Sequence, residues 1–128
     1  MFTPVIPEGA PKPIAPFVPG TRVKDTLYVS GVLALGPNGE SLHAGDVKAQ
    51  TRYVIDEIIR VVEGAGGSLS DICYNAIFLK NRADYAAFNE VYAEYFGANP
   101  PARYCIISEL VRDELLVEIA ATAYLGEP

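Results

Sequence analysis

Hydrophobic and polar positions along this chain follow two spacings, and the first of them predicts strands. Short runs rich in β-branched, aromatic and aliphatic residues, bounded by turn residues, are typical of strands. Such runs occupy residues 26–30, 32–35, 71–79, 100–107 and 117–120. The second run leads into the turn sequence Gly-Pro-Asn-Gly, so we expect a β-hairpin at this point.

The second spacing predicts two amphipathic helices. Apolar residues three and four positions apart extend over residues 47–62 and again over residues 85–96. Asp46 is placed to cap the first helix, and the glycine-rich stretch 64–67 is expected to end it. Asn81 offers an N-cap for the second helix.

The order of these elements predicts an α+β fold, with one mixed sheet and two helices packed on one face. The first twenty residues carry six prolines, so we expect them to be extended, with at most short edge strands. The last two strands are apolar at successive positions, which indicates that other copies of the chain cover the face that the helices leave open. The length favours a single domain over residues 1–128.

Composition and charge narrow the classes of protein. Half of the residues are hydrophobic and a fifth are charged, which is typical of a globular chain. A net charge of -6 without a basic cluster does not favour a nucleic-acid partner. The chain starts without a basic, signal-like region and has no apolar stretch of about 20 residues, so we expect a cytoplasmic protein without a membrane partner.

Cysteine and histidine usage offers little for metal or nucleophilic chemistry. Cys73 and Cys105 form neither a CxxC pair nor a disulfide framework. His43 is the only histidine and lies in a polar, turn-like stretch. Three or four zinc ligands of the usual kind cannot be assembled from these residues, and a Ser-His or Cys-His apparatus would need that one histidine. We therefore expect no metal.

Two charges, Arg103 and Glu118, interrupt the apolar strands at 100–107 and 117–120. Such charges are almost never fully buried unless they are paired. One interpretation is a structural ion pair between adjacent strands. The other is a pocket in which the guanidinium holds a carboxylate and the Glu handles a proton or a water molecule. Arg103 and Cys105 share a strand face, so on neighbouring strands all three groups would converge on one cleft.

Three segments carry a family resemblance. They are Pro-Ala-Arg-Tyr-Cys at 101–105, Val-Glu-Ile-Ala at 117–120 and Tyr-Val-Ser-Gly at 28–31. They resemble the Rid (YjgF) family of enamine and imine deaminases, and the resemblance extends from about residue 6 to residue 125. Residues 15–21 and 48–52 are most similar to the branch that deaminates 3-aminoacrylate in pyrimidine breakdown.

The resemblance implies a chorismate-mutase-like fold and a homotrimer with pockets between subunits. It also implies hydrolytic deamination of a small enamine or imine acid, 3-aminoacrylate or 2-aminoacrylate, with release of ammonia. Enamines hydrolyse readily once they become imines, so positioning and proton transfer suffice, and no cofactor is expected. Two alternatives remain: a deaminase of a larger acid such as 2-aminomuconate, or a non-catalytic module that binds a carboxylate metabolite or acts as a chaperone.

Within this hypothesis Arg103 anchors the substrate carboxylate, while Glu118 orients the attacking water or relays a proton. Each of three residues also has a purely structural interpretation: Ser30 as a plain strand end, Asn89 as a capping or interface residue, and Cys105 as a small buried filler. The family commonly has a Tyr where this chain has a Phe near its N-terminus. The candidate substrate-binding residues are Phe17, Ser30, Gly31, Asn89, Tyr92 and Cys105.

Overall fold

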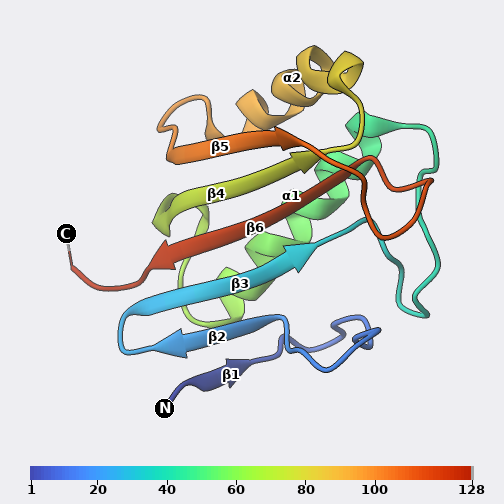
Figure 1. Ribbon diagram of the computed structural model, residues 1–128. Coiled ribbons are helices and arrows are strands. Elements are labelled where there is room, and N and C mark those ends of the chain that lie inside the picture. The colour runs from blue at the N-terminus through green and yellow to red at the C-terminus, as the bar shows by residue number, and fades with distance from the viewer. Residues whose placement is uncertain (128) are drawn as a thin grey trace.

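In the computed structural model, which describes residues 1–127, six strands form one mixed sheet and two α-helices lie together on one of its faces (Figure 1). The strands are β1 (Thr3–Val5), β2 (Gly20–Val23), β3 (Thr26–Val32), β4 (Ile72–Leu79), β5 (Ala102–Ile107) and β6 (Val117–Tyr124). The helices are α1 (Val47–Gly64) and α2 (Tyr85–Phe96). The predicted α+β architecture is confirmed. Within residues 1–127, no helix is both long and apolar enough to cross a membrane.

The sheet has the strand order β1-β2-β3-β6-β4-β5. All neighbouring strands are antiparallel except β4 and β5, which are parallel because α2 connects them across the sheet. β6 enters last in chain order and lies between β3 and β4. The last two strands, β5 and β6, are therefore not neighbours, and the condition for a shared cleft between them is not met. Strand order is set by pairing between distant segments, and the residue pattern of a single strand does not reveal its partners.

The first helix begins and ends where the sequence predicts. The Asp46 side chain accepts a hydrogen bond from the Ala49 backbone N–H at 3.0 Å, which satisfies one free donor of the first turn of α1. The helix ends at Gly64, and Gly66 has a φ of +90°. Side chains along α1, among them Ile55 and Ile58, are buried against the sheet.

The second helix starts differently from the prediction. A short 3-10 turn, η2 (Arg82–Asp84), precedes α2, and Asn81 flanks that turn without capping it. The Asn81 amide instead donates to the Asp84 carboxylate at 3.4 Å. The prediction that Asn81 caps α2 is therefore wrong.

The predicted turn at residues 36–39 is present, closed by a hydrogen bond from the Gly39 N–H to the Gly36 carbonyl at 3.0 Å, but the prediction of a second sheet strand at residues 32–35 is wrong. β3 continues to Val32, and the chain then leaves the sheet with only an isolated bridge between Leu35 and Ser41. β3 already has β2 on one side and β6 on the other, so no sheet position remains for the run 32–35. The hairpin of the sheet joins β2 to β3 instead.

The sheet face turned away from the helices, which we call the open face, carries large exposed side chains. Tyr74 and Tyr104 lie there with ring centroids 6.0 Å apart, and the Phe78 ring is also 6.0 Å from that of Tyr104. Exposed apolar clusters on a soluble domain indicate a surface that another molecule covers. Its large exposed members are Tyr28, Tyr74, Tyr104, Ile106 and Tyr124.

Candidate functional site

Arg103 lies on the edge strand β5 and is held by side chains of α2. Its Nη2 donates to the Asn89 Oδ1 atom at 2.9 Å and to the Tyr85 hydroxyl at 3.2 Å. The guanidinium carbon lies 4.7 Å from the centre of the Tyr92 ring. Hydrogen bonds to neutral partners and an aromatic face fix the guanidinium without cancelling its charge. Arg103 is therefore prepared to bind an anion.

A hollow beside Arg103 contains Cys105, the second predicted residue of this strand. Burial raises the pKa of the Cys105 thiol, although the nearby Arg103 charge works in the opposite direction. A thiol with a raised pKa is a poor nucleophile at neutral pH. Cys105 therefore forms a wall of this hollow, which is lined by Arg82, Tyr85, Arg103, Tyr104, Cys105 and Ile107.

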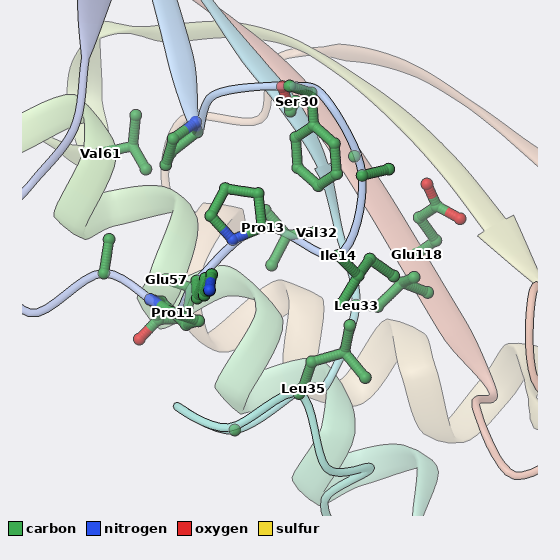
Figure 2. A pocket seen from close by; sticks show the side chains of 18 of the residues that line it. Pro11, Pro13, Ile14, Ser30, Val32, Leu33, Leu35, Glu57, Val61 and Glu118 are labelled. Atoms are coloured by element: carbon green, nitrogen blue, oxygen red, sulfur yellow. The ribbon is translucent and has the colours of Figure 1, made fainter.

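Glu118 lies at a separate cavity of about 320 Å³, formed where the proline-rich segment 7–19 covers the end of β3. Figure 2 shows the Glu118 carboxyl group at one side of this cavity, with Ile14 and Leu33 nearby. The other labelled lining residues are mostly apolar. Burial raises the pKa of Glu118 above its ordinary value of 4.5. This shift moves the carboxyl group toward the range that suits general acid–base catalysis.

Gly31 makes room for that carboxyl group. β3 has a bulge between Val29 and Val32, so the backbone at Gly31 turns close to β6. A Cβ atom at Gly31 would overlap the Glu118 Oε2 atom. Ser30 next to it donates its hydroxyl to the Val18 carbonyl at 2.7 Å, which fastens the N-terminal segment over the cavity.

The predicted substrate-binding residues divide between the two places. Phe17, Ser30 and Gly31 line the cavity of Glu118. Asn89 and Cys105 lie beside Arg103. Tyr92 lines neither one: only 7% of it is exposed, and it packs beneath the guanidinium in the core. Tyr92 thus supports Arg103 from below.

Arg103 and Glu118 do not meet within one chain. Arg103 is in register with Asn75 of β4, and Glu118 is in register with Phe78. Residues an odd number of positions apart on one strand face opposite sides of the sheet. Asn75 is buried under the helices, whereas Phe78 packs on Tyr104 at the open face. The convergence on one cleft, which required neighbouring strands, therefore does not occur within one chain.

The same geometry rules out the structural alternative. None of the ion pairs formed by residues 1–127 joins Arg103 to Glu118. We call the two places the Arg103 half-site and the Glu118 half-site. One supplies a fixed positive charge, and the other supplies a carboxyl group with a raised pKa in apolar surroundings. Within residues 1–127, no group of three or more His, Cys, Asp or Glu residues is placed to hold a metal ion.

Several residues of these half-sites were missed by the sequence analysis. Tyr85 looked like part of an apolar helix face, yet it is 44% exposed and its hydroxyl accepts from Arg103. Tyr53, Glu57 and Val61 of α1 line the Glu118 cavity. Their spacing of four residues marks one stripe of the helix, but only the covering N-terminal segment turns that stripe into a cavity wall.

A comparison with protein families matches residues 7–125 to the family described as Endoribonuclease L-PSP. Among curated proteins, the chain is similar to the 3-aminoacrylate deaminase RutC of Acinetobacter baylyi. The two are 49% identical over 121 residues, which cover 94% of this chain and 96% of that protein.

Solved structures of relatives share the fold. The YjgF gene product of E. coli is 30% identical and superposes with a TM-score of 0.86, covering 97% of this chain and 99% of that one. The E. coli protein TdcF with bound serine is also 30% identical, with a TM-score of 0.84 and coverage of 94% and 98%. The match therefore extends over almost the whole chain.

Proposed function

This chain belongs to the family described as Endoribonuclease L-PSP, also called the YjgF or Rid family, and we propose that it deaminates a small enamine or imine acid with release of ammonia. The preferred substrate is 3-aminoacrylate, which is named in the description of the relative that is 49% identical. The observation that carries the proposal is the half-buried carboxyl group of Glu118, whose pKa is raised, beside an apolar cavity in a chain so similar to that deaminase.

The reaction needs one water molecule and no electron transfer. Protonation of the enamine at C2 gives an iminium ion with its positive centre at C3. Water adds to C3, the C3–N bond breaks, and the products are 3-oxopropanoate and ammonia. Positioning and proton transfer can supply the acceleration, so we propose that the enzyme uses no metal or organic cofactor.

Glu118 has the properties that this sequence of steps requires. A protonated Glu118 delivers its proton to C2, and the carboxylate formed then takes a proton from the attacking water. The same group next protonates the leaving nitrogen and recovers a proton from the hydroxyl group as the carbonyl forms. A carboxyl group whose pKa lies above 4.5 can be present in both protonation states more easily at neutral pH.

Arg103 provides the anchor for the substrate carboxylate. Its guanidinium carries a fixed positive charge that attracts a carboxylate. Asn89 and Tyr85 keep the group in place through Nη2. The name of the related TdcF structure includes bound serine, a small molecule with a carboxylate. This agrees with the size and charge of the substrate that we propose.

We further propose that the site is completed between subunits of a homotrimer. Within one chain the two half-sites lie on opposite faces of the sheet, so a shared substrate requires Arg103 from one copy and Glu118 from the next. The exposed aromatic side chains of the open face support this assembly, because they would be buried against neighbouring copies. The number of three rests on the resemblance to the Rid family.

The family description includes the word endoribonuclease, but we do not propose a nucleic-acid substrate. The net charge is -6, and binding of a phosphate backbone depends on several Lys and Arg side chains. The hollow beside Arg103 contains one further basic residue, Arg82. A carboxylate needs no more positive charge than Arg103 supplies.

The test is release of ammonia from enzymatically generated 3-aminoacrylate and 2-aminoacrylate. We expect acceleration by the wild type, with 3-aminoacrylate preferred. Arg103→Ala should lower kcat/KM by about 100-fold, because charge-assisted hydrogen bonds contribute about 1.5–3 kcal/mol each. Arg52→Ala is the matched control, since it removes a guanidinium that is paired with Glu94 on the outer surface of the helices.

Two outcomes would contradict the proposal. No acceleration of either substrate by the wild type would exclude deamination of small enamine acids; acceleration with 2-aminomuconate would then favour a larger substrate. Equal activity of Arg103→Ala and Arg52→Ala would remove Arg103 from substrate binding. Carboxylate binding without any turnover would favour a binding module.

A further inference from the structure

A buried asparagine on β4 lies in register with Arg103. Asn75 is 0% exposed, and Ile77, the next residue of β4 on the same face of the sheet, is buried and apolar. Asparagine is depleted in strands, and a buried amide costs free energy unless its donors and acceptor are paired. The Asn75 Oδ1 atom has no hydrogen-bond partner among the described residues, so this side chain stabilises the fold less than a fully paired amide would. The presence of Asn75 therefore indicates a role other than stability.

The hydrogen bonds of Asn75 connect it to the support of Arg103. Its Nδ2 atom donates to the Tyr92 hydroxyl at 3.0 Å. The ring of Tyr92 lies under the guanidinium, 4.7 Å from the Arg103 carbon atom Cζ. Fixing the hydroxyl therefore fixes the surface on which the guanidinium rests. Asn75 therefore contacts the proposed carboxylate anchor, Arg103, through a single intervening residue, Tyr92.

Two buried polar atoms of this group have no hydrogen-bond partner among the described residues, and they are complementary. One is Asn75 Oδ1, an acceptor, and the other is Arg103 Nη1, a donor. Both belong to side chains that contact Tyr92. Because Nη1 is buried, it faces the protein, whereas Nη2 is occupied by α2. An acceptor on the protein side is what the inner nitrogen needs.

We propose that Asn75 is a positioning residue for Arg103: its amide nitrogen donates to the Tyr92 hydroxyl and so holds that ring beneath the guanidinium. This inference rests on the proposed role of Arg103 as the carboxylate anchor. Asn75 touches no substrate. Its effect is to fix the orientation of the guanidinium, so that the loss of Asn75 weakens carboxylate binding more than it slows proton transfer.

The test compares Asn75→Leu and Tyr92→Phe with the wild type. Leucine has a branched shape like that of Asn75, although it is larger, and it removes both polar atoms, whereas Tyr92→Phe keeps the ring and removes only the hydroxyl. We expect each to raise KM about tenfold with kcat changed by less than about twofold, since ground-state carboxylate binding is affected. The double variant should be no worse than Asn75→Leu, because both changes break one connection.

Thr51→Val is the matched control. Thr51 is 0% exposed and donates its hydroxyl to the Val47 carbonyl at 2.6 Å, within α1. Its loss removes one buried hydrogen bond far along the chain from Arg103, so it should lower stability and leave KM unchanged. A KM change in this control equal to that of Asn75→Leu would overturn the inference, because general loosening of the fold would then explain both.

A binding measurement separates this inference from the deaminase proposal. Propionate is a stable three-carbon carboxylate, and propionamide is its uncharged counterpart. We expect the wild type to bind propionate more tightly than propionamide. In Asn75→Leu the Kd for propionate should rise about tenfold, while the Kd for propionamide stays unchanged. Neither compound turns over, so this result stands even if the wild type releases no ammonia. An unchanged preference in folded Asn75→Leu and Tyr92→Phe would overturn the inference alone.

Discussion

Arg103 and Glu118 project from opposite faces of one sheet, and β4 separates the strands that carry them. Each group is prepared for chemistry by its own surroundings. The guanidinium rests on α2, and the carboxyl group lies over a glycine at the end of β3. A substrate that uses both groups must therefore bridge two copies of the chain.

Subunit mixing tests this directly. Arg103→Ala and Glu118→Gln should each be about 100-fold less active than the wild type when alone, because each loses one half-site in every subunit. Mixed oligomers formed from equal amounts should recover about one quarter of the wild-type activity, since one site in four combines two intact half-sites. Ammonia release after co-refolding measures this. Absence of any recovery in confirmed mixed oligomers would contradict a site shared between subunits.

Gly31→Ala is expected to inactivate the enzyme without unfolding it. The added Cβ would overlap the Glu118 Oε2 atom, and the flexible carboxyl group must move away. A displacement of about 1 Å can lower kcat by about 100-fold. Gly64→Ala is the control, because its Cβ would meet the Pro7 Cβ at an ordinary 3.5 Å near the end of α1. That change should stabilise the helix by about 0.5–1 kcal/mol and leave kcat unchanged.

Glu118→Gln should raise stability at neutral pH while it removes activity. Burial raises the pKa of Glu118 in the folded state, so the folded protein binds this proton more tightly than the unfolded chain does. Stability from this group is present below the unfolded pKa and is lost as pH rises through the raised folded pKa. Glutamine carries no such charge. The Tm of Glu118→Gln should exceed that of the wild type at pH 7, and the difference in Tm should vanish below about pH 4.

Thermal scans of both proteins from pH 3 to pH 8 measure this effect. Glu94→Gln, which changes an exposed carboxylate paired with Arg52, serves as the control for loss of a charge. A wild type that is more stable than Glu118→Gln at pH 7 would contradict the conclusion that the Glu118 carboxyl group is desolvated in the folded protein. The kcat of Glu118→Gln should fall by about 100-fold or more, as expected for loss of a general acid and base.

Tyr74→Lys should weaken the assembly of subunits. Tyr74 lies on the open face beside Tyr104, and a charged side chain there cannot be buried cheaply against a neighbouring copy. The variant should elute as a smaller species in size-exclusion chromatography with light scattering. It should also lose activity, because the sites shared between subunits no longer form. Glu63→Lys, on the exposed side of α1, is the matched control. Equal masses for all three proteins would exclude the open face as the interface.

Gln50→Leu should destabilise the fold more than any surface change. The buried Gln50 amide donates to the carbonyls of Leu42, His43 and Glu114 and accepts from the Leu116 N–H. Leucine would leave these groups without a partner, at a cost of about 3 kcal/mol. Urea denaturation measures this loss. The neighbouring variant Thr51→Val, which removes a single hydrogen bond, should cost clearly less.

Local signals made much of this structure predictable. The Asp46 cap and the glycines after residue 63 bound α1 as expected, because both act within a few residues. Arg103 and Glu118 were conspicuous because a charge in an apolar strand needs a partner. Their neighbours in space were not predictable in the same way. Insertion of β6 between β3 and β4 depends on pairing between segments far apart in the sequence.

Asn75 and the run 32–35 show why the rest escaped prediction. Asn75 lies inside an apolar run, whose pattern predicts an ordinary strand residue, although a single amide among buried neighbours is itself a signal. The run 32–35 has strand-like residues, but both sides of β3 are already paired, so tertiary context overrides its preference. In both cases the deciding partner comes from another part of the chain.

The central position of β6 has a consequence for how the protein folds. β1, β2 and β3 can pair among themselves, and so can β4 and β5, but only β6 joins the two groups. Its pairings span long stretches of sequence, which are slow to form. The same strand carries Glu118. The carboxyl group that we assign to proton transfer is therefore brought to its cavity by the step that completes the sheet. A chain that has not completed this step lacks the Glu118 half-site.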